Sequence, residues 1–154
     1  MNPAINEVYG NKVRVRVCGV CWQEGKLLMV NHRGLTAGEF WAPPGGGVTF
    51  AESAATCLRR EFLEETGLEV HNERFLFACE FIQDQLHAIE LFFEVRIVGG
   101  KIVRGHDPEL PIIEEVRFLS PSEIRRLPGA SRHGIFNLVR SPEDLTTLSG
   151  FFRI

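Results

Sequence analysis

The sequence predicts one α/β domain, spanning residues 1–154, in which strands alternate with a few helices. Three observations carry this prediction. With 154 residues, of which 44% are hydrophobic, the chain has enough apolar material for the core of one ordinary domain. Apolar residues recur at every second position in both halves of the chain, as they do in strands. A segment between the two halves has apolar residues at helical spacing and residues that typically begin and end a helix. No repeat or linker marks a second domain.

The first predicted elements are two strands joined by a turn. Residues 13–22 (VRVRVCGVCW) alternate as a strand does, and residues 23–26 (QEGK) form the turn. Residues 26–33 (KLLMVNHR) are the hairpin partner, and we expect this hairpin to open the sheet. Residues 34–48 hold five glycines and two prolines, too many for a regular element, so they predict a shaped loop.

A helix is predicted next, and further strands follow it. The helix runs from Ser53 to Thr66, and Gly67 stands where a left-handed residue usually ends a helix. The later elements are strands at 74–83 and 87–98 before a Gly-Gly break, a strand at 114–120, a helix starting at 120–123 (SPSE), and a second helix-start signal at 141–144 (SPED).

Composition narrows the classes of partner. The formal net charge of −3 gives no general electrostatic attraction for duplex nucleic acid or an anionic membrane. No segment reaches the roughly 18 apolar residues of a membrane span, and the first residues lack the apolar core of a signal peptide, so we expect a cytoplasmic protein. The four cysteines are expected to be reduced. Cys18 and Cys21 are expected to point to opposite faces of one strand rather than to bind zinc.

The predicted helix carries carboxylates that need an explanation. At 100° per residue, Glu64 and Glu65 lie on either side of Glu61, so three like charges share one stripe. An adjoining apolar stripe of Ala55, Leu58 and Phe62 can pack on a sheet, which would give the helix a core side and an acidic side.

Metal binding explains the crowded carboxylates better than simple solvation. Arg60 directly precedes Glu61 and lies four residues before Glu64, so it can hold a carboxylate by charge-assisted hydrogen bonds. The Gly-rich segment before the helix allows close approach of a ligand to the backbone. Mg²⁺ prefers oxygen ligands and suits clustered carboxylates beside a phosphate.

This stretch resembles the signature of the Nudix hydrolase family. That signature is a glycine, five residues, a glutamate, seven residues and then Arg-Glu-apolar-x-Glu-Glu-x-Gly-apolar. The nine matching positions are Gly46, Glu52, Arg60, Glu61, Phe62, Glu64, Glu65, Gly67 and Leu68. The flanking hairpin, the residues FWAPPGG and the later strands and terminal helix also resemble the family, so the likeness spans nearly the whole chain.

The resemblance implies an α/β/α sandwich with a mixed sheet, and hydrolysis of a nucleoside diphosphate linked to another group. It implies Mg²⁺, or alternatively Mn²⁺, bound by Glu61 and Glu65, with Glu64 sharing a second ion or orienting a water. A backbone carbonyl of Gly45 or Gly46 would complete the metal shell. The supporting pair that aims Glu61 would be Glu52 and Arg60.

Several points stay open at the level of sequence. The general base can be Glu64, Glu109, Glu114 or Glu115. The partner is expected to be a small nucleotide of unknown identity, and the number of metal ions and a homodimer are also open. No role is assigned to Arg14, Arg16, Arg33, Phe40, Trp41 or Phe81, since strand arginines are usually solvated and large aromatics usually belong to the core, and the five histidines show no metal-ligand spacing.

Two other functions remain as alternatives. One is a nucleotide-binding sensor of Nudix type, although such domains usually lack some signature carboxylates and this chain keeps them all. The other is an isoprenoid diphosphate isomerase, a reaction that some Nudix-like enzymes perform with an additional cysteine. Cys57 and Cys79 are the cysteines near the signature, but neither has the surrounding pattern of those enzymes.

Overall fold

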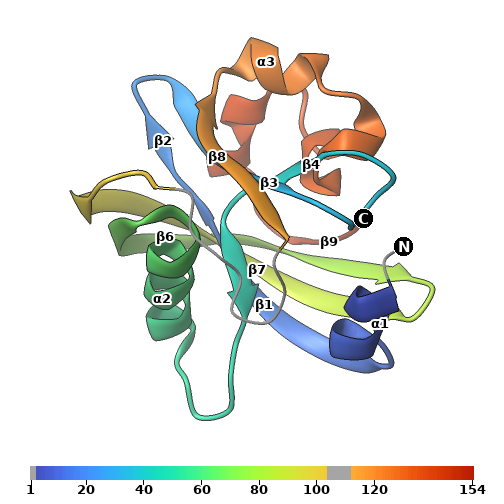
Figure 1. Cartoon of the computed structure of the whole chain (residues 1–154). Coiled ribbons are helices and arrows are strands. Elements are labelled where there is room, and N and C mark those ends of the chain that lie inside the picture. Colours follow the sequence, from blue (N-terminus) through green and yellow to red (C-terminus); the bar gives the residue numbers. More distant parts are fainter. Residues whose placement is uncertain (1–2, 104–111) are drawn as a thin grey trace.

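The computed structural model describes residues 3–103 and 112–154, and it contains two sheets with helices on their outer sides (Figure 1). The helical segments in chain order are α1 (Pro3–Tyr9), α2 (Ala54–Thr66), α3 (Pro121–Arg126), and the 3₁₀ turns η1 (Gly129–Ser131), η2 (Gly134–Asn137) and η3 (Pro142–Thr146). The strands are β1 (Lys12–Val20), β2 (Trp22–Gln23), β3 (Lys26–His32), β4 (Phe40–Ala42), β5 (Gly45–Gly47), β6 (Leu68–Gln83), β7 (Leu86–Gly100), β8 (Ile113–Leu119) and β9 (Phe151–Arg153).

The two sheets have different topologies. The larger sheet has the order β5-β1-β7-β6-β9 and is mixed, because β1 runs parallel to β7 and β9 runs parallel to β6. In the smaller sheet, β3 pairs with β2, β4 and β8, all antiparallel. The predicted α/β class with a mixed sheet is therefore confirmed, with a second sheet added to it.

The predicted opening hairpin is only partly correct. The turn at Glu24 and Gly25 joins β2 to β3, and Trp22 pairs with Leu27 as expected. However, β1 belongs to the larger sheet, where it lies between β5 and β7, so the strand predicted at 13–22 is divided between two sheets. Alternation of apolar residues defines the faces of a strand but not its neighbours, which is why the division was not foreseen.

Helix α2 forms as predicted, with both end signals in use. The side chain of Ser53 accepts a hydrogen bond from the Thr56 N–H at 3.1 Å, which satisfies one free donor of the first turn. Gly67 has φ 76°, a left-handed conformation that costs glycine little, and its N–H donates to the Leu63 carbonyl at 3.0 Å. The helix therefore begins and ends where its sequence directs.

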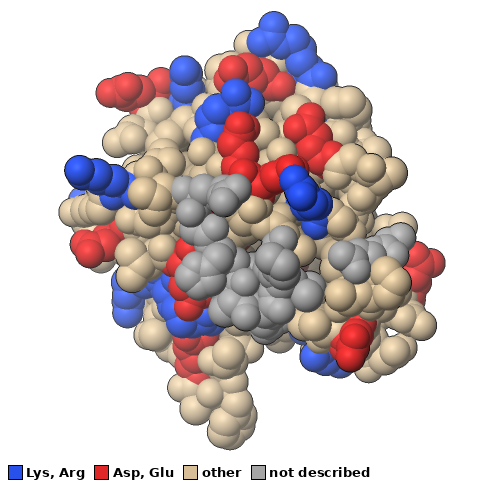
Figure 2. Space-filling model, in the orientation of Figure 1, with Lys and Arg blue, Asp and Glu red and all other residues tan. Residues whose placement is uncertain are grey.

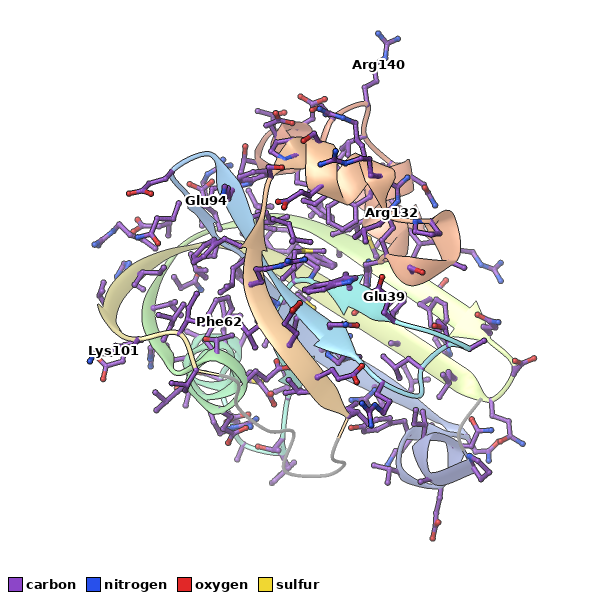
Figure 3. All side chains as sticks on the ribbon, turned by 45° about the horizontal axis from the view of Figure 1, so that its top comes forward. Glu39, Phe62, Glu94, Lys101, Arg132 and Arg140 are labelled. Carbon is purple, nitrogen blue, oxygen red and sulfur yellow. The ribbon has the colours of Figure 1, made fainter. Side chains whose placement is uncertain are left out.

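Two apolar cores lie on opposite sides of the sheets. The core under α2 contains Leu58 and Phe62, both fully buried, and Phe62 lies between the helix and the strands in Figure 3. The second core lies under the C-terminal helical segments and includes Ile124. Cys18 belongs to this second core and Cys21 to the first, so the two cysteines face opposite sides and are free, as predicted.

Other elements depart from the sequence prediction. The Gly-rich segment predicted as a loop contains β4 and β5, and the latter pairs with β1 through backbone groups that require no side chains. Both β6 and β7 are longer than predicted, and β7 includes the Gly-Gly pair that was predicted to end it. Helix α1 was not predicted. The capping box of SPSE starts α3 as predicted, whereas SPED starts a 3₁₀ turn rather than an α-helix.

The surface has no large region of one charge on the face shown in Figure 2, where basic and acidic side chains are interspersed. The side chain of Arg140 extends outward into solvent in Figure 3. None of the helices in the described residues is both long enough and apolar enough to cross a membrane.

Candidate functional site

The signature residues meet around one guanidinium group. Arg60 donates through Nε to Glu52 at 2.7 Å and through Nη1 to Glu61 at 3.0 Å and Glu64 at 3.1 Å. A further Nη2 contact reaches the second oxygen of Glu52 at 3.0 Å. Glu52 also accepts from the N–H of Thr49, so it ties the helix to the preceding loop. One positive charge thus faces three carboxylates.

Glu61 and Glu65 are buried against strand β5 rather than exposed on an acidic side of the helix. Their exposed fractions are 8% and 3%, and the Glu65 carboxylate accepts from the Gly45 N–H at 2.8 Å. A Cβ added to Gly46 would lie 2.2 Å from the carboxyl carbon of Glu61. The absence of a side chain at Gly46 is therefore what leaves room for the Glu61 carboxylate.

The prediction of separate core and acidic sides is accordingly wrong. Leu58 and Phe62 are buried as predicted, but Ala55 is only partly buried, and the fully buried Cys57 belongs to the core side instead. Residues three or four positions apart share a helix face, so Glu61 lies beside Leu58, and Glu65 beside Phe62, on the sheet-facing side.

Burial and crowding change the acidity of this cluster. The pKa of Glu61 is raised from 4.5 to about 7, first because the carboxyl is buried and next because Glu65 lies beside it, while Arg60 opposes the increase. In contrast, the pKa of Glu52 is lowered to about 2, chiefly by its hydrogen bond to Arg60. The charge of Glu61 is thus less fully compensated by the protein than that of Glu52.

A cavity of about 680 Å³ opens beside this cluster. Its described lining includes Arg60, Glu61, Glu65 and the glycines of β5. The opposite walls come from α1, the β6–β7 turn and the segment around η1, which places the carboxylates at one end of a space large enough for a nucleotide-sized ligand.

The cavity also contains a buried polar group that the sequence analysis missed. Glu90 on β7 is 3% exposed, forms an ion pair with Arg16 on β1, and accepts from His133 Nε2 at 2.9 Å. Burial raises the pKa of Glu90, but His133 and Arg16 outweigh that effect and hold it at about 2. The available signal was an acidic residue among the apolar residues of the predicted strand 87–98. That strand also contains Glu94, so the pattern singled out neither Glu90 nor its partners.

The candidates for a general base are placed differently. Glu64 belongs to the Arg60 cluster and its side chain is 26% exposed. Glu114 pairs with Arg33 and Glu115 lies 3.8 Å from Arg117, and neither is among the described residues that line the cavity. Glu109 lies outside the described residues.

The aromatic residues and cysteines named in the sequence analysis lie either in a core or in the cavity lining. Trp41 is 2% exposed and belongs to a core, whereas Phe40 and Phe81 line the cavity. Cys57 and Cys79 are fully buried, and Cys57 contacts the Gly47 carbonyl at 3.4 Å.

The acidic cluster contains the carboxylate oxygens that a hard cation prefers, but these oxygens are not arranged around a common metal position. Over residues 3–103 and 112–154, no three His, Cys, Asp or Glu side chains are already arranged to hold a metal ion. The oxygens of Glu61 and Glu65 instead contact Arg60 and the Gly45 N–H. In the described part of the chain, Arg60 is the one cation in contact with Glu52, Glu61 and Glu64, so this cluster holds more carboxylates than the guanidinium can neutralise. Such oxygen donors suit Mg²⁺ or Mn²⁺.

Comparisons with known proteins identify the family of the domain. A model of the NUDIX domain matches residues 10–138. The chain is 27% identical over 95 residues to an ADP-ribose pyrophosphatase of Methanocaldococcus jannaschii, and the match covers 60% of this chain but only 56% of that relative.

Solved structures share the fold. One is a NUDIX hydrolase from Nitrosomonas europaea, with a TM-score of 0.71 and 23% identity, covering 82% of this chain and 85% of that one. Another is an ADP-ribose pyrophosphatase from Streptococcus suis, with a TM-score of 0.61 and 19% identity, covering 90% of this chain and 98% of that one.

Proposed function

The chain belongs to the NUDIX domain family, and from that premise we propose that it is a metal-dependent pyrophosphohydrolase. Its substrate would be a nucleoside diphosphate linked to another group, and its cofactor Mg²⁺ or Mn²⁺. The observation that carries the proposal is the burial of Glu61 and Glu65 at the end of a cavity, with Arg60 shared among the neighbouring carboxylates. Two relatives named as ADP-ribose pyrophosphatases support a substrate of this kind.

In this proposal each signature residue has a role. Glu61, Glu65 and the Gly46 carbonyl would hold the cation, and Glu64 would share in its binding. A cation bound there would offset the charge of the diphosphate oxygens and lower the pKa of the attacking water. Arg60, fixed by Glu52, would keep the Glu61 and Glu64 carboxylates in place, because it contacts all three.

Glu64 is the best candidate for the group that accepts the proton of the attacking water. Its carboxylate shares Arg60 Nη1 with the proposed metal ligand Glu61, whereas Glu114 and Glu115 lie beside Arg33 and Arg117, outside this cluster. A general base must reach the proton that it removes, so its position is the first criterion.

The test combines activity with metal binding. Purified protein is assayed with Mg²⁺, Mn²⁺ or EDTA against ADP-ribose, UDP-sugars, NADH and coenzyme A, and released nucleotides are separated by chromatography. Thermal melts with and without Mg²⁺ are recorded for the wild type, the double variant Glu61→Gln and Glu65→Gln, and Glu64→Gln. The exposed carboxylate Glu69 on β6 provides the matched control, Glu69→Gln.

We expect metal-dependent turnover in the wild type and the control. The double variant should lose both turnover and the Mg²⁺-induced increase in melting temperature, because its cation ligands are neutral. Glu64→Gln should lose turnover but keep most of that increase. Equal Mg²⁺ effects in the wild type and the double variant, or turnover surviving in the double variant, would refute the metal assignment.

The two alternatives are separated by the same measurements. A sensor would bind a nucleotide without turnover in the wild type. An isomerase would need a reactive cysteine at the cavity, and both Cys57 and Cys79 are fully buried and absent from its described lining. The structure therefore favours hydrolysis over isomerisation.

A further inference from the structure

The cavity that borders the carboxylates of α2 also borders a second charged group. This group consists of Arg16, Glu90 and His133, which we call the Arg16 triad, and all three line the cavity. In the larger sheet, Arg16 stands between Gly47 of β5 on one side and Glu90 of β7 on the other. A Cβ added to Gly47 would lie 3.4 Å from Arg14 Nη2, so a second guanidinium also lies beside this glycine.

Both carboxylate oxygens of Glu90 accept hydrogen bonds from neighbouring side chains. The Ile135 N–H donates to His133 Nδ1 at 3.2 Å, so the ring proton lies on Nε2, and Nε2 donates to Glu90 Oε1 at 2.9 Å. The other oxygen, Oε2, accepts from Arg16 and lies 3.7 Å from the Cys18 sulfur. A carboxylate with both oxygens engaged at 3% exposure is a fixed anchor for Arg16.

Arg16 itself is not saturated. Among the described residues, its guanidinium donates one side-chain hydrogen bond, from Nη1 to Glu90, whereas a guanidinium carries five N–H donors. Its side chain is 24% exposed and borders the cavity. A planar guanidinium with free donors, anchored at one nitrogen, has the geometry that binds phosphate oxygens in pairs.

The location fits the substrate that the acidic cluster would process. Glu61 and Glu65 lie close enough to Arg16 to act on its charge. A diphosphate with one phosphate near these carboxylates therefore also lies near the free side of Arg16. Arg14, two residues earlier on the same strand face, also lines the cavity, with its guanidinium 3.9 Å from the ring centre of Tyr9.

We propose that Arg16 binds non-bridging oxygens of the substrate's diphosphate, and that Glu90, held by His133, positions Arg16 for this contact. The inference rests on the proposed pyrophosphohydrolase function and adds a substrate-binding residue outside the signature helix. Glu90 acts through Arg16, so it is a positioning residue rather than a catalytic one.

The test measures binding without turnover. Methylene diphosphonate, whose P–C–P bridge is not hydrolysed, is titrated calorimetrically into the protein in the presence of Mg²⁺. Arg16→Lys keeps the charge but removes the planar fork. Glu90→Asp keeps the negative charge, but its shorter side chain moves the carboxylate away from Arg16 and His133. Arg74→Lys is the matched control, because Arg74 forms a comparable cross-strand ion pair with Glu94 at 2.9 Å outside the cavity lining.

Arg16→Lys should weaken diphosphonate binding by about 10-fold or more, because a charge-assisted hydrogen bond to phosphate is lost. Glu90→Asp should weaken it by about 3- to 10-fold, and the double variant should bind no more weakly than Arg16→Lys alone, since both changes act on one contact. Arg74→Lys should bind as the wild type does. Thermal melts of each variant, which should remain cooperative, check that the fold is kept.

The outcomes separate this inference from the function on which it rests. If the wild type hydrolyses a nucleoside diphosphate derivative and Arg16→Lys binds the diphosphonate within about twofold of the wild type, the role of Arg16 is refuted and the function stands. Additive losses from Glu90→Asp and Arg16→Lys would refute the positioning role of Glu90. A wild type that neither binds the diphosphonate nor hydrolyses any of the panel would refute both.

Discussion

Replacing Glu61 by glutamine tests whether the buried, ionised carboxylates lower the free energy of unfolding of the metal-free protein. Glu61 is 8% exposed, and its pKa is raised from 4.5 to about 7 by burial and then by Glu65. At 1.36 kcal/mol per pKa unit, this displacement corresponds to about 3 kcal/mol of destabilisation when the carboxyl is ionised. Glutamine keeps the size of the side chain and removes the charge.

The sign of the pH dependence follows from the direction of the pKa change. Between pH 4.5 and about 7 the folded protein binds more protons at Glu61 than the unfolded chain does. The free energy of unfolding contributed by this residue therefore falls as pH rises through that window. Glu61→Gln and the wild type should differ little below pH 4.5, and the variant should be more stable by up to about 3 kcal/mol above pH 7.

The assay is a series of thermal melts in EDTA between pH 4 and 8.5. For a chain of this size, about 3 kcal/mol corresponds to an increase of about 6–12 °C in melting temperature. With Mg²⁺ at 100 times its dissociation constant, the wild type should gain about 2.7 kcal/mol and the variant much less. Glu69→Gln should leave both effects as in the wild type. A Glu61→Gln protein that is no more stable than the wild type at pH 8 in EDTA would refute the reasoning.

Three further predictions follow from the same site. Arg60→Ala should reduce turnover by about 10- to 100-fold with a largely intact fold, measured by kcat and a thermal melt, because it removes the group that orients the carboxylates. Gly46→Ala should abolish activity, since its Cβ would lie 2.2 Å from the Glu61 carboxyl carbon, whereas Gly38→Ala meets nothing within 4 Å and should retain wild-type kcat. The pKa of Glu90 is lowered from 4.5 to about 2, so its contribution to the free energy of unfolding is present above pH 4.5 and is lost as pH falls towards 2. Glu90→Gln should therefore make the free energy of unfolding depend less on pH in that range, and an unchanged pH dependence would contradict the buried ion pair.

The helix ends and the contacts within helix α2 could be predicted from the sequence, because they depend on residues close together in the chain. Ser53 and Gly67 set the ends of α2 through contacts within four residues of the helix, and the capping box at Ser120 starts α3 in the same way. The spacing of Arg60 from Glu61 and Glu64 likewise follows from helical periodicity, so their contacts could be anticipated.

Only the tertiary structure decided which surfaces meet. The alternation of residues 13–22 defined two strand faces, but pairing with β5 and β7 placed Arg16 between Gly47 and Glu90, and those positions are far apart in the chain. Likewise, the sequence predicted Glu61 and Glu65 on an acidic side of the helix, whereas both are buried, and the missing side chain of Gly46 leaves the space that Glu61 occupies. Periodicity fixes the direction of a side chain relative to its own element, whereas the charge and shape that it meets depend on long-range packing, which no local pattern encodes.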